Sequence, residues 1–209
     1  MMDAMSKPAG SLAVRKIKAQ GPGLMWHLRN RIRWGFIWGF IAYHMAFLCA
    51  RVLGFTSVVS KLDLMVIKAN GRRIHYGTVG YRVVTTAGVN AMATAFITPA
   101  SPGNFYYHGI GHTNTAEAVG DTTLAAEETT AYNPDSTRAT GTHVQGASAN
   151  IYQSVATNTV DGAVSCVEHG IFSAASSGTL LDRTVFSTVT LASGDGLQST
   201  YNLTFTAGG

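Results

Sequence analysis

Two histidines in the middle of the sequence, His108 and His112, have a spacing that is compatible with a metal site. On a helix, residues four apart lie on one face and can bind a metal ion together. Gly109 and Gly111 lie nearby, so a strand that enters a loop is the better prediction. Further ligands would have to come from distant parts of the sequence: His143, Glu168 and His169. We therefore expect histidines that bond to the backbone and no metal or other cofactor, with a metal site at His108 and His112 as the alternative.

Glu168 and His169 are an acid and a histidine side by side, as in a general-base pair. Adjacent residues of a strand point to opposite faces, so this pair is poorly placed for such a role. No nucleophile elbow, phosphate-binding glycine loop or HExxH motif occurs in the chain. Asp182 and Arg183 are predicted to form a structural polar cluster. Other acids are predicted to form a solvated face: Asp121, Glu127 and Glu128. We do not expect an enzyme.

The groups considered so far lie in a region, residues 59–209, whose pattern is that of a β domain. Apolar residues alternate with other residues along Leu62–Val66, and Asn70 with Gly71 gives the strongest two-residue hairpin signal. We count eight to ten short strands, spaced as in a sandwich or barrel. The sequence therefore predicts a mainly β fold, an antiparallel β-sandwich of jelly-roll-like type with one short helix.

The individual elements of this domain are predicted as follows. The helix covers residues 87–96, is capped by Thr85 or Thr86, and buries Val89, Met92 and Phe96. Residues 138–144 and 149–157 form paired strands, with Ile151 and Val155 facing inward. The end of the chain forms a meander of four strands, at 163–169, 171–174, 184–191 and 199–206. In the last of these the inward residues are Tyr201, Leu203 and Phe205.

Residues 34–50 form a run of seventeen residues without a formal charge, closed by Arg51. Apolar residues cover every side of a helical projection of this run. Its length is at the lower limit for a membrane span, and the basic sequence before it fits the positive-inside pattern. A cleaved signal peptide fits poorly, because more than thirty residues precede the run and no small-residue cleavage site follows it. Two readings stay open, a membrane span and a helix buried in an assembly.

Charge divides the chain sharply. Residues 1–82 carry 13 Lys and Arg against two acids, whereas residues 83–209 carry two Arg against nine acids. Such an uneven distribution of charge indicates that the N-terminal part binds an anionic partner. We expect a basic arm at 1–33 that passes into a helix near Leu24, an apolar helix at 34–58 and the β domain at 59–209. The two cysteines, Cys49 and Cys166, suggest buried thiols in a protein made in a reducing cytosol.

The acidic half resembles virion structural proteins of tailed bacteriophages. Several blocks carry the resemblance in a fixed order: residues 107–124, 146–152, 167–186 and 194–201. Within them lie Asp121-Thr-Thr-Leu124, Glu168-His-Gly-Ile-Phe172 and Leu180-Leu-Asp-Arg-Thr-Val-Phe186. The chain departs from the family at His112, where Thr is common. The resemblance covers about residues 81–209 and implies a β-sandwich module that decorates heads or builds tail parts.

We therefore expect a non-enzymatic phage virion protein, made in the host cytoplasm and assembled into the virion. The favoured role is a capsid-associated decoration or cement protein, and the alternatives are a tail or neck component or a membrane-anchored β domain. Expected partners are the major capsid protein or neighbouring virion proteins and further copies of the chain, with a membrane through 34–50 as the alternative and nucleic acid not expected. The predicted interface residues are Arg29, Arg31, Arg33, Trp34, Phe36, Ile37, Trp38, Phe40 and Phe47.

Overall fold

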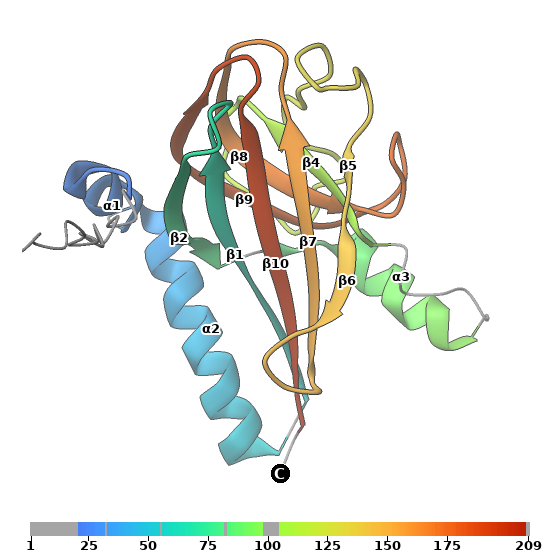
Figure 1. Ribbon diagram of the computed structural model, residues 1–209. Helices are drawn as coiled ribbons and strands as arrows, with labels where there is room; N and C mark the ends of the chain where they lie inside the picture. The colour runs from blue at the N-terminus through green and yellow to red at the C-terminus, as the bar shows by residue number, and fades with distance from the viewer. Residues whose placement is uncertain (1–20, 32, 55, 82, 98–104, 208–209) are drawn as a thin grey trace, which may run out of the picture.

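Two antiparallel β-sheets that face each other form the body of the protein (Figure 1). The computed structural model describes residues 21–31, 33–54, 56–81, 83–97 and 105–207. The first sheet has the strand order β2 (Arg73–Tyr81), β1 (Ser57–Ile67), β10 (Gly196–Thr206), β7 (Ile151–Thr159) and β6 (Thr142–Gln145). The second has the order β3 (Val83–Val84), β9 (Leu180–Leu191), β8 (Val164–Phe172), β4 (Tyr107–Gly111) and β5 (Ala139–Thr140). The prediction of a mainly β, antiparallel sandwich is confirmed.

Three helices accompany the sheets in the described part of the chain: α1 (Leu24–Arg31), α2 (Trp34–Leu53) and α3 (Thr86–Ile97). Helix α2 lies beside β2 and β1, whereas α3 lies on the other side of the sandwich, against β9 (Figure 1). The sandwich begins with β1 at Ser57, close to the predicted boundary at residue 59. Residues 1–20 of the predicted basic arm lie outside the described residues.

The chain turns from one sheet into the other at two corners. At the first, β2 is followed directly by β3, and at the second, β5 is followed by β6 across Gly141. A side chain at Gly141 would collide with the hydroxyl of Ser154 and the carbonyl of Tyr106, so the corner needs glycine. Strands that bend in this way close the open edges between two packed sheets.

The central alternation of β1 was predicted correctly. Leu62, Leu64 and Val66 are at most 3% exposed and face the second sheet, and the Asn70–Gly71 turn joins β1 to β2. Gly71 adopts a φ of 79°, which is accessible to glycine at little cost. In β10, Tyr201 and Leu203 are buried as expected, but Phe205 is 39% exposed. It pairs with Val58, itself 37% exposed, at the lower end of β1 and β10 in Figure 1.

The predicted four-strand meander is wrong. Residues 164–172 form a single strand, β8, which passes through Gly170 without a turn. A side chain at Gly170 would come within 2.9 Å of Leu124, Leu180 and Phe172, so the glycine allows close packing. The chain then pairs β8 with β9 in the second sheet, and crosses to the first sheet for β10.

The inward face of β7 was also assigned wrongly. Strands β6 and β7 pair as predicted, but Ser154, Ala156 and Asn158 are buried, whereas Ile151 and Val155 are partly exposed. The reason is that the interior at this position is polar. The Asn158 side chain donates a hydrogen bond of 2.8 Å to the carbonyl of His108 in β4.

Helix α3 begins where it was predicted, but it buries a different face. The Thr85 hydroxyl accepts a hydrogen bond of 3.0 Å from the Gly88 amide, which confirms the cap. Gly88 packs on β9 so closely that a Cβ there would lie 2.6 Å from the carbonyl oxygen of Leu181. Phe96, expected in the core, is 93% exposed. Met92 does pack against the core as expected, whereas Val89 is 49% exposed. The close contact at Gly88, together with Met92, therefore sets the face that the helix buries.

Asp195 fastens the turn between β9 and β10 to the β1–β2 hairpin. Its carboxylate accepts hydrogen bonds from Lys68 Nζ at 2.6 Å, from the Ala192 amide at 2.8 Å and from the Ala69 amide at 3.1 Å. Burial acts to raise the pKa of Asp195, but these bonds outweigh it and hold the pKa below its ordinary value.

Because the folded-state pKa of Asp195 is depressed, its contribution to stability is present above its unfolded pKa of about 3.9 and is lost as pH falls through the folded value. We expect Asp195→Asn to lower the free energy of unfolding by about 1–3 kcal/mol at neutral pH. We also expect the difference from the native chain to shrink below about pH 4. Urea unfolding at several pH values measures both, and a difference that is constant across the acid range would contradict the assignment.

Candidate functional site

Helix α1 is fixed to both sheets through buried polar contacts. Asn30 is 2% exposed; its Nδ2 donates to the Val79 carbonyl in β2 at 2.9 Å, and its Oδ1 accepts from the Ser187 amide in β9 at 3.1 Å. The Trp26 indole donates to the Thr188 carbonyl at 2.9 Å. The helix expected near Leu24 is therefore present, and it is docked on the sandwich.

Helix α2 lies with one face against Tyr81 of β2. The rings of Phe36, Phe40 and Tyr43 lie 4.9–5.5 Å from the Tyr81 ring, centre to centre. Gly39 allows this approach, because a Cβ there would lie 2.8 Å from the Tyr81 carbonyl oxygen. The helix ends at Gly54, whose φ is 73° and whose amide donates to the Ala50 carbonyl at 3.1 Å.

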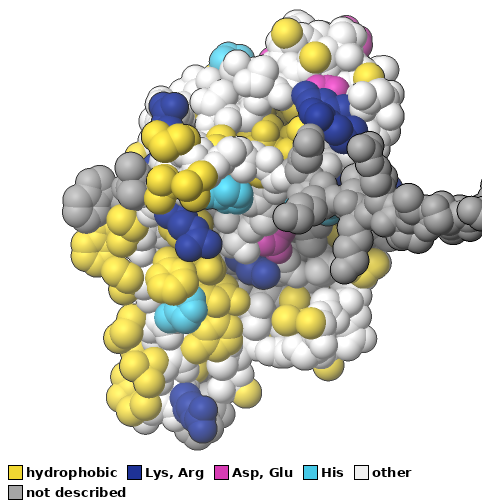
Figure 2. Space-filling view, turned by 60° about the vertical axis from the view of Figure 1, so that its left-hand side comes forward, with side chains coloured by type: hydrophobic (Ala, Val, Ile, Leu, Met, Phe, Trp, Pro, Cys, Tyr) yellow, Lys and Arg dark blue, Asp and Glu magenta, His cyan; other side chains and the backbone are white. Residues whose placement is uncertain are grey.

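The opposite face of α2 is apolar and exposed. We call it the outer α2 face and define it by Trp38, Ile41, Met45, Leu48 and Val52, which are 43–68% exposed. Leu53 and Phe40 are also exposed at its margins, although the Phe40 ring contacts Tyr81 as well. Figure 2 shows hydrophobic side chains gathered along one side of the molecule, with Lys and Arg among them. A contiguous exposed apolar patch of this kind indicates an interaction site.

Positive charge predominates beside the outer α2 face, and Glu117 is an acid close to Trp38. The sequence from Gly21 to Leu62 contains no Asp or Glu. Arg29 and Arg31 are exposed and Arg33 is half-buried. Burial lowers the pKa of Arg33, against the opposing effect of Glu117. This surface is suited to a partner that is both apolar and anionic.

The predicted interface residues fall into separate groups. Four of them are exposed: Arg29, Arg31, Trp38 and Phe40. Another four are half-buried: Arg33, Phe36, Ile37 and Phe47. The side chain of Trp34 lies outside the described part. The Phe36 ring contacts Tyr81, and the Phe47 ring lies 5.1 Å from Tyr43. The sequence therefore found the right helix, but could not show that part of it packs within its own chain.

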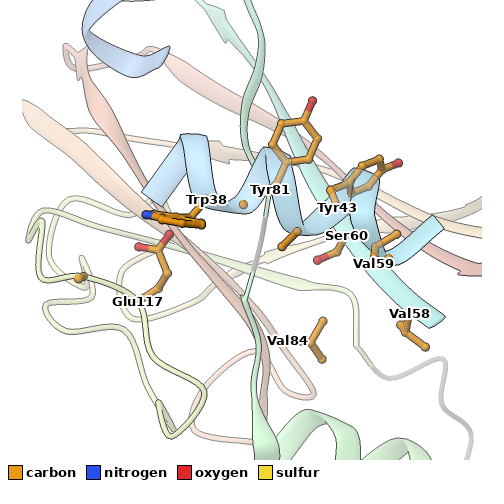
Figure 3. Close-up of a pocket in the computed structure, with 12 residues that line it drawn as sticks. Trp38, Tyr43, Val58, Val59, Ser60, Tyr81, Val84 and Glu117 are labelled. Atoms are coloured by element: carbon orange, nitrogen blue, oxygen red, sulfur yellow. The ribbon is translucent and has the colours of Figure 1, made fainter. Parts of the chain in front are cut away.

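A groove of about 520 Å³ runs between α2 and the sandwich (Figure 3). On the helix side it is lined by Trp38 and Tyr43, and on the strand side by Val58 and Val84. Glu117 lies at one end, close to Trp38 in Figure 3. The walls are mainly apolar, so the groove extends the interaction surface and has little catalytic character.

A serine and two histidines form a hydrogen-bonded row inside the sandwich. His108 Nε2 lies 2.8 Å from Ser154 Oγ, and His108 Nδ1 lies 3.0 Å from His169 Nε2. This is the geometry of a nucleophile, a base and an orienting group. All three residues are fully buried, and the backbone at Gly141 abuts the Ser154 hydroxyl. The row therefore joins β4, β7 and β8 and gives no substrate access.

Sequence reasoning missed this row, because its members are 46 and 61 residues apart. The prediction that His108 bonds to the backbone from a loop is wrong, since its ring lies in the core. Glu168 and His169 do point to opposite sides of β8: Glu168 reaches Arg183 at 2.7 Å, while His169 reaches His108. His112 lies outside the core, 3.7 Å from Glu128, and does not approach His108. Among the described residues, no group of three or more His, Cys, Asp or Glu is placed to hold a metal.

The acids expected on a solvated face are engaged in the fold. Arg183 binds Glu168 and also Asp121, at 2.8 Å, whereas the Asp182 carboxylate accepts hydrogen bonds from Ser60 Oγ at 2.6 Å and from the Tyr201 hydroxyl at 3.2 Å. Both residues are structural, as predicted, but they belong to separate polar clusters on the two faces of β9. Arg138 binds Glu127 at 2.6 Å. Glu128 accepts hydrogen bonds from the amides of residues 129–131. These contacts bind the segment after β4 to the second sheet, so the prediction of a solvated acidic face is wrong.

Comparisons of the chain with protein-family models, with curated protein sequences and with solved structures gave no match. A function can therefore be argued only from the residues and their arrangement. The arrangement contains one surface with the properties of a binding site, formed by α1, the outer α2 face and the groove.

The seating of α2 on Tyr81 can be tested at Gly39. We expect Gly39→Val to push α2 away from β2 and to lower the free energy of unfolding by about 1–3 kcal/mol. Trypsin should then cleave faster after Arg51, near the end of α2. The matched control is Ala42→Val, at an exposed position of the same helix. Equal cleavage rates for both variants would show that α2 does not depend on this contact.

Proposed function

We propose that this chain is a non-enzymatic structural protein of a bacteriophage virion, and specifically a capsid-associated decoration or cement protein. The observation that carries the proposal is the exposed apolar and basic surface of α1 and α2, fixed to an antiparallel sandwich. The resemblance of residues 81–209 to phage virion proteins supports the same role. A tail or neck component of the virion uses the same surface and is the alternative.

Docking of this surface is an anchoring mechanism. Burial of exposed apolar side chains contributes about 25 cal/mol per Å², so the outer α2 face supplies affinity for neighbouring chains. Arg29, Arg31 and Arg33 orient the protein on an acidic partner such as a capsid protein. The polar interior supports the non-enzymatic part of the proposal, since the Ser154–His108–His169 row is sealed.

We also propose the finer description of the fold as jelly-roll-like. The strand pairs β1–β10, β3–β9, β4–β8 and β6–β7 are nested, as in a long hairpin rolled around a barrel. The arrangement departs from an ideal jelly roll, because the pairs β3–β9 and β4–β8 share one sheet.

A membrane-anchored β domain is the second candidate. Residues Phe36–Leu53 have a mean hydropathy of 1.6, and 6% of this stretch is buried. A span would need lipid on every side of α2, whereas its inner face packs on Tyr81. Flotation of the full chain with vesicles of anionic and zwitterionic lipid tests this candidate directly.

Imaging of particles that carry the protein tests the virion role. We expect a copy number that matches the capsid lattice, with α1 and α2 facing the shell. The variant with Arg29→Glu, Arg31→Glu and Arg33→Glu should reduce binding at least about tenfold at low salt, because each reversed charge opposes an acidic surface. Arg73→Glu, exposed in the β1–β2 hairpin, is the matched control. A few copies per particle would favour the tail or neck, and unaffected binding would remove the arginines from the mechanism.

A further inference from the structure

We propose that the outer α2 face binds the outer α2 face of a second copy of this chain, in a two-fold helix pair. The pairing is a separate proposal from the virion role, because it can be measured in solution without particles. Failure of either proposal therefore leaves the other testable. In a pair of this kind the same residues contribute from both copies.

The spacing of the outer α2 face is that of a helix–helix seam. Its residues, Trp38, Ile41, Met45, Leu48 and Val52, follow one another at alternating intervals of three and four. Such spacing places them at the a and d positions of two heptads. With that register, Tyr43 and Ala50 occupy the f position, on the opposite side of the helix. Both lie toward the sandwich, where Ala50 is fully buried and the Tyr43 ring meets Tyr81. With respect to the described residues, the seam side chains are therefore 43–68% exposed, and Trp38 at one end also lines the groove.

The side chains in the seam suit a two-helix pair. Ile41 and Leu48 occupy d positions, while Met45 and Val52 occupy a positions. In parallel pairs a β-branched residue at a with leucine at d favours two strands, and Val52 with Leu48 matches that pattern, whereas Met45 and Ile41 do not. Trp38 adds a large aromatic side chain at one end, 62% exposed in the single chain.

The exposed area is close to the lower limit for a specific pair. The outer α2 face contains five apolar side chains that are 43–68% exposed. At about 100 Å² each, they bury on the order of 500 Å² per copy, or about 1,000 Å² in the pair, which is about the least that a specific interface buries.

Charge does not oppose the pairing. None of the seam positions is charged, and the flanking positions on the open side are His44 and Arg51, which are both exposed. The five seam side chains therefore bring no charge of their own into the pair, and Glu117 lies beside Trp38 at one end of the seam. The arginines Arg29, Arg31 and Arg33 lie on α1 and its junction with α2, outside the seam, so a pair keeps them available for an acidic partner.

Sedimentation of the full chain at micromolar concentrations tests the proposal. We expect the native protein to sediment at twice the mass of one chain. Ile41→Glu and Leu48→Glu should each weaken pairing at least about 100-fold, because a carboxylate would enter an apolar seam. Both side chains are half-exposed in the single chain, so an unchanged circular dichroism spectrum is expected. Val119→Glu, at a position 63% exposed and outside α2, is the matched control.

Cross-linking locates the contact. Met45 lies near the middle of α2, and a residue near a two-fold axis meets its own copy. Met45→Cys in a Cys49→Ser background should therefore form a disulfide-linked dimer on mild oxidation. Cys166 is fully buried, and burial raises the pKa of its thiol to about 12, so it does not interfere. Val119→Cys in the same background should remain a monomer.

Three results would overturn the pairing. The first is a native chain that stays monomeric across the concentration range. The second is an oligomer that the Ile41 and Leu48 variants leave intact, because another surface would then hold it. The third is a monomer that floats with anionic vesicles and loses this property with Leu48→Glu, which would assign the outer α2 face to a lipid surface.

Discussion

The position of the candidate binding surface depends on one buried amide, that of Asn30. It spans the gap between the two sheets, donating to β2 and accepting from β9. Leaving either group of a buried amide unsatisfied costs free energy, so the amide fixes α1 where both partners are within reach. Helix α2 follows after a short turn, and the Gly39 contact with Tyr81 then sets its direction along the sheet. The face of α2 that remains is the apolar one.

The interior of the sandwich combines apolar packing with polar rows. Leu62, Leu64 and Val66 pack in the usual manner, while His108, Ser154 and His169 form hydrogen bonds across three strands. On the other side of the second sheet, Arg183 joins Glu168 and Asp121. Directional bonds of this kind fix which strands lie together more strictly than apolar contacts do. They also explain why Ser154, His108 and His169 lie together in the core, where all three are fully buried.

The same physical argument connects the proposed function with the proposed pairing. The sandwich satisfies its own polar groups, and its acids are largely engaged within the fold, whereas the helices leave apolar side chains and arginines exposed. Hydrophobic area gives affinity and charge gives orientation. On the proposed function, the protein binds through its N-terminal helices and displays the β domain.

The sequence alone determined the features that depend on local chemistry. These are the alternation in β1, the Asn70–Gly71 turn, the Thr85 cap and an apolar helix from Trp34, because each follows from backbone preferences or from periodicity over a few residues. Only the tertiary structure decided which face each element buries. Glycines at 39, 88 and 170 select close contacts that no hydrophobic pattern reveals, and the polar interior beside β7 reverses the face expected from Ile151 and Val155. The exposure of α2 was undecided for the same reason: its composition is apolar on all sides, and only the contact with Tyr81 distinguishes the inner face from the outer one.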